Sequence, residues 1–340
     1  MDGSRPGLQR REPLHQTGSV SGDGENRRDM PTQRLIFVHI PKAAGSTLRQ
    51  IIRRQMPRGN DLTMYFIGIK PGRTRADGVV ESSALEDIER LRHLTDDERA
   101  QIVCVLGHLP FGIHEFLPPG FEYITMLRNP VERIISDYYY ILRRPTHRLY
   151  QAIQSRQISL EQYVTSGLDP RLDNGQVRYL CGMREVDGVF GDGALTERAL
   201  EAAKRNLEER IKTFGITERF DESVLLFRRA MGWRNVFYES ENVTRGRPKI
   251  AGLPSDVVKT MEEQLSYDME LYHFAANLFE RRLRRARIGR FQLESFRSMN
   301  AALRLYTRFQ KGGVSSAVDM VRERVTQFEE RTSERQATAR

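Results

Sequence analysis

The chain has 340 residues and a net charge of +9, and 39% of its residues are hydrophobic while 29% are charged. This composition is typical of a soluble globular protein and excludes a wholly disordered chain. No run approaches the ~18 apolar residues that a membrane-spanning helix needs, so we expect no transmembrane segment. The length fits one large domain with an appendage, or two modest domains.

The first 32 residues are polar and rich in Gly, Arg, Asp and Ser. They contain no apolar core of a secretory signal, and we expect a disordered tail. The two cysteines, Cys104 and Cys181, lie in apolar surroundings, which favours reduced core thiols over a disulfide framework. A cytoplasmic location is therefore the default expectation.

Residues 34–40 form a short apolar run that predicts a buried strand. A turn of small residues follows, and Leu48, Ile51 and Ile52 then have helical spacing. Residues 60–100 are poorly patterned, although 86–100 are charged and indicate a helix. The runs 102–106 and 123–127 predict two further buried strands.

The helix after the third strand has clear start signals. Asn129 suits the N-cap, Pro130 suits the first helical position, and Glu132 lies three residues after the cap. A later helix is expected to begin at Thr196. Its expected apolar face comprises Leu200, Ala203, Leu207, Ile211 and Phe214, although residues 213–217 also resemble the end of a strand.

A long helix is expected from Ser255, as its cap, to about residue 286, and helices are expected near 293–310 and 314–330. Residues 281–340 contain fifteen Lys or Arg and six Asp or Glu, so they carry a net charge of +9 while the first 280 residues are neutral overall. Such a segment either binds an anionic partner or is a solvated helical face. A heptad seam, expected to pack on the body or to form a homo-oligomer, comprises Val314, Val318, Val321, Val325 and Phe328.

Strands that alternate with helices indicate an α/β fold with a parallel sheet and helices on both faces. In such folds ligands bind beyond the carboxyl ends of the strands. The three loops that follow the predicted strands are therefore the expected place for chemistry, and each of them carries unusual polar residues.

The first loop, residues 39–47, combines small residues with a cation and two hydroxyl groups. Its backbone N–H groups and the start of the following helix are suited to hold a phosphate-like anion. The loop is not a Walker A motif, because no lysine stands beside the hydroxyl residues, and a plain structural turn is the alternative. The candidate anion-binding residues are Lys42, Ala44, Gly45, Ser46 and Thr47.

The other two loops supply a second cation and a histidine. Arg128 ends the third strand and Ser136 lies eight residues later, so the pair is a candidate for a second phosphate. The alternative is an ion pair between Arg128 and Glu132 with Ser136 on the helix surface. His108 follows the second strand and a glycine, where a general base would be well placed.

Five segments together resemble the carbohydrate sulfotransferases. FVHIPKAAGSTL is similar to their FxHIPKTxGTT signature, LRNPVERIISDYYY to LRDPxxRxxSxYYY, and GHLPFG to the Gly-His of heparan sulfate 2-O-sulfotransferases. The run from Asn174 to Leu180 resembles the N-x-Q-x-R-x-L of the 6-O-sulfotransferases, and Gly215 to Glu218 resembles their G-[LI]-T-E. These segments occur in family order over roughly residues 34–275.

The resemblance implies a P-loop-kinase-like α/β domain that uses 3′-phosphoadenosine 5′-phosphosulfate (PAPS) as sulfuryl donor and needs no metal. Lys42 would contact the 5′-phosphosulfate, and Arg128 with Ser136 would bind the 3′-phosphate. His108 would accept the proton of a hydroxyl on a carbohydrate or glycoconjugate, and no nucleic acid partner is expected. The implied division is a tail at 1–32, a sulfotransferase domain at 33–286 and a basic helical extension at 287–340. Gly45, Ser46 and Thr47 would cradle the same 5′ group as Lys42.

Two other functions and one other base are kept as alternatives. The first is a nucleotide-dependent kinase or phosphotransferase with a degenerate phosphate loop, and the second is a non-catalytic protein that binds anionic glycans through its basic end. Within the sulfotransferase hypothesis His39 is a rival for the general base, although its place at the end of the first strand favours a packing role.

Overall fold

The computed structural model describes residues 33–56, 63–67, 84–183, 194–239, 248–307 and 309. The chain divides into residues 1–32 and residues 33–340, and all described residues belong to the second unit. The predicted tail and the predicted heptad seam at 314–328 lie outside the described residues. The proposed domain boundary after residue 286 stays a prediction.

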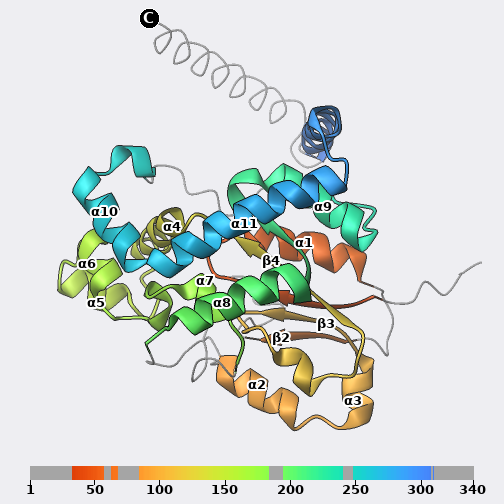
Figure 1. Ribbon diagram of the computed structural model, residues 1–340, viewed down its shortest axis with the longest axis horizontal. Helices are drawn as coiled ribbons and strands as arrows, with labels where there is room; N and C mark the ends of the chain where they lie inside the picture. Colours follow the sequence, from red (N-terminus) through yellow and green to blue (C-terminus); the bar gives the residue numbers. More distant parts are fainter. Residues whose placement is uncertain are drawn as a thin grey trace, which may run out of the picture. The chain divides into compact units, whose positions relative to one another are not determined.

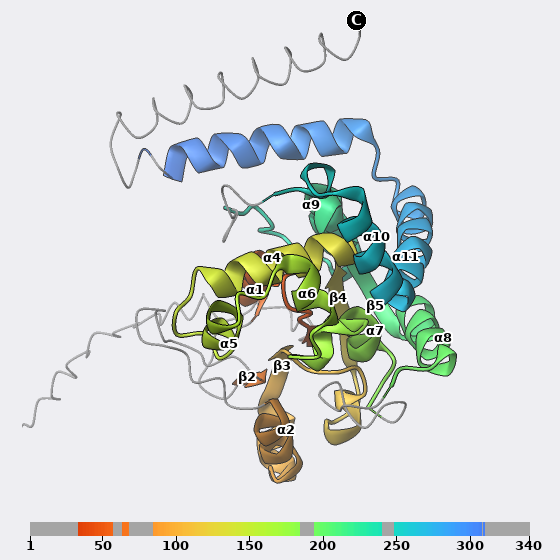
Figure 2. The same ribbon diagram turned by 90° about the vertical axis from the view of Figure 1, so that its left-hand side faces the viewer.

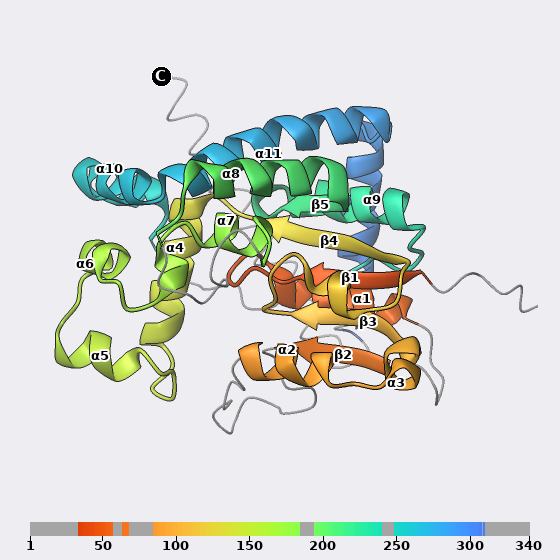
Figure 3. The same ribbon diagram turned by 60° about the horizontal axis from the view of Figure 1, so that its bottom comes forward.

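Five parallel strands form one sheet in the order β2-β3-β1-β4-β5. The strands are β1 (Arg34–Val38), β2 (Thr63–Ile67), β3 (Ile102–Gly107), β4 (Phe121–Leu127) and β5 (Ile211–Ile216). β3 is buried along its whole length and β1 beyond its first residue, as expected where helices cover both faces of a parallel sheet. Figure 3 shows the strands pointing toward α4, α6 and α7.

Most described helices flank the sheet or lie beyond its carboxyl edge (Figure 1). The longer helices are α1 (Gly45–Gln55), α2 (Ala84–Arg92), α4 (Pro130–Leu142), α8 (Glu197–Arg205), α9 (Phe220–Met231), α10 (Ser255–Gln264) and α11 (Ser266–Arg285). The shorter ones are α3 (Asp96–Gln101), α5 (Tyr150–Ser155), α6 (Leu160–Thr165) and α7 (Gly175–Leu180).

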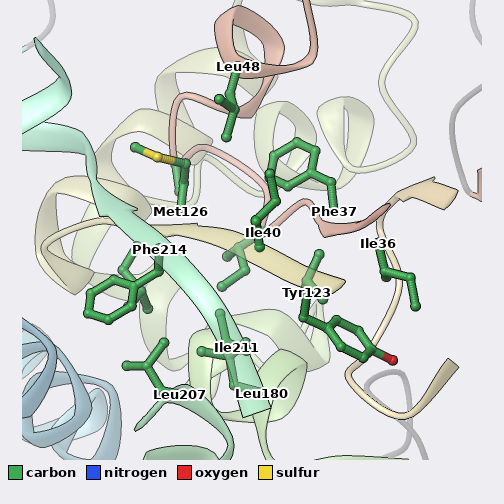
Figure 4. Packing of buried hydrophobic residues seen from close by; sticks show 14 of the residues in the cluster. Ile36, Phe37, Ile40, Leu48, Tyr123, Met126, Leu180, Leu207, Ile211 and Phe214 are labelled. Carbon is green, nitrogen blue, oxygen red and sulfur yellow. The ribbon is translucent and has the colours of Figure 1, made fainter. Parts of the chain in front are cut away.

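The hydrophobic core has two parts. The larger part surrounds the sheet, where Phe37, Met126 and Phe214 come from three neighbouring strands and Leu48 from α1 (Figure 4). The smaller part joins α4, α6 and α10, and Tyr163 is fully buried within it. The second cluster holds a helical wall in place beyond the carboxyl edge of the sheet.

The α/β fold class with a P-loop-kinase-like sheet is confirmed by the strand order, in which β1 is central. The three predicted strands are β1, β3 and β4. β2 was not predicted, because it lies within the poorly patterned residues 60–100. Asn129 caps α4 as predicted, and its side chain accepts a hydrogen bond from the Glu132 amide at 3.1 Å.

The helix predicted from Thr196 through Phe214 was wrong in its second half. α8 ends at Arg205, a π-helical turn covers Asn206–Arg210, and β5 then begins at Ile211. Phe214 pairs with Thr125 of β4. The alternative interpretation of residues 213–217 as the end of a strand is therefore confirmed. Leu207, Ile211 and Phe214 are spaced by four and three residues, so the apolar positions of β5 also match a helical period.

The single helix predicted from Ser255 to about residue 286 was also wrong. It is two helices that meet at Leu265, and the cap position of α10 is Pro254. Leu265 is fully buried, and next to it Asn174 accepts a hydrogen bond from the Asp268 amide at 2.8 Å. The side-chain amide of Asn174 also donates to the last carbonyl of α10 at 3.3 Å. These tertiary contacts explain the break, for which the local sequence contains no signal.

A further helix covers residues 290–307 (blue in Figure 2). Phe296 stacks on Phe237 with ring centroids 5.6 Å apart, and Asn300 accepts a hydrogen bond from the Tyr238 amide at 2.9 Å. Within the described part of the chain, no helix combines the length and the apolar character that a membrane crossing requires.

Candidate active site

The loops after β3, β1 and β4 are neighbours because β1 lies between the other two strands. Val38, the last residue of β1, pairs with Gly107 of β3 and with Thr125 of β4. The residues that follow these strands are His39, His108 and the β4–α4 turn. The fold therefore brings all three predicted loops to one edge of the sheet.

The first loop has an unusual backbone. Lys42 and Ala44 are both in the left-handed region, with φ of 67° and 57°. Residues other than glycine adopt this conformation at an energetic cost, and such strain is concentrated at functional sites. α1 begins immediately after it at Gly45, so Ser46 and Thr47 lie in its first turn. The predicted anion-binding residues therefore lie where the loop meets the positive end of α1, an arrangement suited to an anion.

Gly45 is required by the packing of His39. A Cβ on Gly45 would lie 2.0 Å from Cδ2 of the His39 ring. That ring is 6% exposed and stacks on Phe37 with ring centroids 5.4 Å apart. The buried position of the ring agrees with a packing role for His39. The alternative role of His39 as the general base stays a prediction.

His108 is oriented by the first loop. Its Nδ1 lies 2.9 Å from the main-chain oxygen of His39, and the two rings lie 4.6 Å apart. A carbonyl oxygen only accepts, so Nδ1 must carry the proton and donate it. In the neutral ring the lone pair is then on Nε2. This is the tautomer in which the second nitrogen can accept a proton from a substrate.

Arg128 holds the first loop from the opposite side. Its Nη1 donates to the main-chain oxygen of Lys42 at 3.0 Å, and its Nη2 donates to Glu132 at 3.1 Å. Glu218 lies 3.9 Å from its Nε, and the arginine is 8% exposed. The ion pair with Glu132, considered above as an alternative to phosphate binding, is therefore present. The phosphate-binding role of Arg128 stays a prediction.

The Lys42 ammonium lies on an aromatic ring of α4. Its Nζ is 3.6 Å from the centroid of the Tyr140 ring. Burial lowers the pKa of Lys42 to about 8, and although Asp137 raises it, the guanidinium groups of Arg128 and Arg144 lower it further. Lys42 is thus a cation whose charge is sensitive to its surroundings near neutral pH.

Ser136 lies on α4 and is 8% exposed. It belongs to a row of residues spaced by four along α4 and the turns at its two ends. Tyr140 and Arg144 are the members of this row that the sequence analysis did not single out. The repeat of four residues from Arg128 was a signal that would have placed Tyr140 beside the site. The α4 stripe comprises Glu132, Ser136 and Tyr140 within the helix, Arg128 just before it and Arg144 just after it.

The Asn174–Leu180 motif supports the site without entering the loops. The buried Gln176 side chain accepts from the Arg128 amide at 3.0 Å and donates to the Arg128 carbonyl at 2.8 Å. Arg178 pairs with Asp173 beside it. In the other motif, Glu218 accepts from the Asn129 amide at 3.0 Å. Both motifs therefore fix the turn between β4 and α4.

The donor groups around the first loop are cationic or hydroxylic, and within the described residues no group of three or more His, Cys, Asp or Glu side chains is arranged to hold a metal ion.

A family model described as Galactose-3-O-sulfotransferase matches residues 6–332. The chain belongs to the galactose-3-O-sulfotransferase family. The resemblance to carbohydrate sulfotransferases in the sequence motifs is thereby confirmed.

Curated relatives of this family member include other carbohydrate sulfotransferases. Human heparan-sulfate 6-O-sulfotransferase 1 is 25% identical over 189 residues, which cover 48% of this chain and 45% of the relative. The Drosophila melanogaster heparin sulfate O-sulfotransferase is 28% identical over 172 residues, covering 46% and 48%. Human uronyl 2-sulfotransferase is 26% identical over 179 residues, covering 46% and 42%. The chain therefore spans less than half the length of these relatives.

A solved structure, mouse sulfotransferase SULT7A1 complexed with PAP, is also similar to this family member. It is 13% identical, with a TM-score of 0.27, and the match covers 72% of this chain and 90% of that chain.

Proposed function

We propose that the protein transfers a sulfuryl group from PAPS to a hydroxyl of a carbohydrate or glycoconjugate, with His108 as general base. Family membership supports the sulfotransferase class. The observation that carries the proposal is the hydrogen bond from His108 Nδ1 to the His39 carbonyl. It ties the candidate base to the loop that would hold the donor, so base and donor site are positioned by one segment.

The residues of the first loop fit the charged groups of PAPS. Lys42 and the N-terminus of α1 would hold the 5′-phosphosulfate, with Ser46 and Thr47 as hydroxyl donors. Arg128 and Ser136 would hold the 3′-phosphate. PAPS, when bound, supplies the activated sulfuryl group. Lys42 then stabilises the negative charge that develops on the leaving oxygen, which is a role for a preorganised cation.

His108 would accept the proton of the acceptor hydroxyl at Nε2. The resulting imidazolium is stabilised by the carbonyl that already accepts from Nδ1. The names of the relatives support heparan sulfate, heparin or other glycosaminoglycans as acceptors to test first, and the family description adds galactose.

The deciding experiment is calorimetric binding of PAP and AMP without metal. The two ligands differ only in the 3′-phosphate, so the ratio of their affinities isolates the contribution of that group. We expect PAP to bind more tightly than AMP by roughly tenfold or more, as for a charge-assisted phosphate contact. Arg128→Ala should bring the ratio close to one, even if it also loosens the Lys42 loop and weakens both ligands.

An ATP affinity above that of PAP, increased by magnesium, would contradict the proposal and favour the kinase hypothesis, since phosphoryl transfer depends on the metal. A protein that binds none of these nucleotides but retains heparin would favour the non-catalytic glycan-binding protein. Transfer of labelled sulfate from PAPS to heparan sulfate, chondroitin and galactose-terminated oligosaccharides then identifies the acceptor.

A further inference from the structure

Lys42 is held by the α4 stripe at two points, its main-chain carbonyl and its ammonium group. At its main-chain end the carbonyl oxygen accepts from Arg128 Nη1 at 3.0 Å. At its other end the ammonium lies 3.6 Å from the Tyr140 ring centroid. Ser136 lies between these two members of the stripe in sequence. The lysine therefore lies beside the stripe that also contains the predicted partners of the 3′-phosphate.

Charged groups of α4 and of the turns at its two ends act on this ammonium. Asp137 of α4 is the anion among them, and its effect is opposed by the guanidinium groups of Arg128, Arg144 and Arg143. The Tyr140 ring is a neutral group that also attracts the ammonium, because the face of an aromatic ring is electron-rich. The ring and the carboxylate therefore both favour a position of the ammonium beside α4.

The Tyr140 ring is itself fixed by its neighbours. The Arg144 guanidinium lies 4.3 Å from the same ring centroid, and His147 packs edge-on against it with ring centroids 6.0 Å apart. A ring that is held by contacts from the end of α4 and the following turn has little freedom to move. It can therefore define where the lysine ammonium lies.

We propose that Tyr140 is a positioning residue that presets the Lys42 ammonium for the 5′ group of the donor. The inference rests on the proposed function, in which Lys42 contacts that group. A flexible lysine loses rotamer freedom when it binds a phosphate, and a side chain that is already ordered loses less of it. Removal of the ring should therefore weaken donor binding through Lys42 alone.

The first test observes the contact without any ligand. Protons above an aromatic ring are shifted upfield by its ring current, so the Lys42 ε-methylene signal should be upfield of the other lysines in an NMR spectrum. The signal is assigned by its loss in Lys42→Met. It should persist in Tyr140→Phe, which keeps the ring, and move to the ordinary lysine position in Tyr140→Leu. An unshifted signal in the unmodified protein would overturn the proposal.

The second test is a double-mutant cycle on the affinity for PAP. Tyr140→Leu should weaken binding by about 3- to 10-fold, and Tyr140→Phe by less than about 2-fold. In the Lys42→Met background the same Tyr140→Leu change should have no further effect. The matched control is Tyr139→Leu on the same helix, whose ring packs on Tyr138 and which should leave PAP affinity unchanged.

Two results of the cycle would overturn the inference. An equal loss in both backgrounds would mean that Tyr140 supports only the fold, and tighter PAP binding in Tyr140→Leu would mean that the ring competes with the donor for Lys42. If the unmodified protein does not prefer PAP to AMP, the proposed function fails, and the NMR signal still decides whether Tyr140 holds the lysine.

Discussion

At the scale of single residues, the first loop is fixed through its carbonyl oxygens. His108 donates to the oxygen of His39 and Arg128 to that of Lys42, at 2.9 and 3.0 Å. Because these carbonyls are held, the path of the loop into the start of α1 is fixed from two sides. The two side chains that would act on acceptor and donor thus also shape the loop.

The lowered pKa of Lys42 predicts a pH-dependent affinity for PAP. The free ammonium is protonated below a pKa of about 8 and loses its charge above it, while the phosphates of PAP are ionised throughout this range. If only the protonated lysine binds, affinity should fall roughly tenfold per pH unit above 8. Calorimetry from pH 6.5 to 9.5 measures this, and Lys42→Met should abolish the decline. Because a bound anion raises the pKa of the lysine, proton uptake on binding is expected near pH 8.

The proposed base role of His108 predicts a loss of turnover that exceeds any loss of donor binding. His108→Ala should lower kcat by about 10² to 10⁴ and weaken PAP binding by much less, because the ring shapes the first loop but does not belong to the predicted phosphate contacts. The matched control is His93→Ala, just after α2, whose side chain is 77% exposed and which should have full activity. A His108→Ala enzyme with full kcat would contradict the assignment and return attention to His39.

At the scale of elements, buried polar side chains join helices that are distant in the sequence. Asp268 of α11 is fully buried and accepts from the amides of Gln176 and Val177 at 3.1 and 2.8 Å, and it lies 3.7 Å from Arg133 of α4. One carboxylate therefore connects α11, the start of α7 and α4. The Gln176 side chain continues the connection to the end of β4.

Asp268→Asn should strongly destabilise the fold. The asparagine keeps the shape, but it presents an NH₂ group to a backbone N–H and leaves Arg133 buried without its anion. Removal of one partner from a buried pair typically costs about 3–5 kcal/mol of unfolding free energy. Urea unfolding should show this, with Asp256→Asn in the exposed first turn of α10 as a control near zero. A cost below about 1 kcal/mol would mean that the pair is unimportant for stability.

The elements that the sequence predicted are those with local signals. The α4 start has its cap and proline within four residues, and β1, β3 and β4 are short apolar runs next to turns. Residues 213–217 gave a local signal for the end of β5, whereas its start at Ile211 and the break at Leu265 depend on tertiary contacts, which no local pattern encodes. The same holds in the site. Lys42, His108 and Arg128 follow strands and were predictable, whereas the contact between Lys42 and Tyr140 depends on how α4 packs beside the first loop.

At the scale of the whole molecule, the helix at residues 290–307 is anchored at particular points. Phe296 is 4% exposed and stacks on Phe237, while Phe291, one and a half turns earlier, is 80% exposed. Arg304 also donates to the Tyr238 carbonyl at 3.1 Å. The helix therefore contributes to the main core through one side and leaves other apolar side chains at the surface.

Phe296→Ala should destabilise the protein by about 3–5 kcal/mol, the cost of truncating a buried phenylalanine. Phe291→Ala removes the same group from an exposed position and should change stability by less than about 0.5 kcal/mol. Urea unfolding of both variants at one pH makes the comparison. Equal and small effects would show that the helix at 290–307 is not part of the cooperative unit.

The central position of β1 determines when the first loop becomes ordered during folding. The contacts that hold the first loop span 69 residues for His108 and 86 residues for Arg128. Long sequence separations make contacts late and slow during folding. A chain that has formed α1 but has not yet added β3 and β4 on either side of β1 lacks both of the hydrogen bonds that hold the loop. Recovery of PAP affinity during refolding should therefore lag behind the recovery of helix, and specific activity should report the fraction of molecules whose sheet is complete.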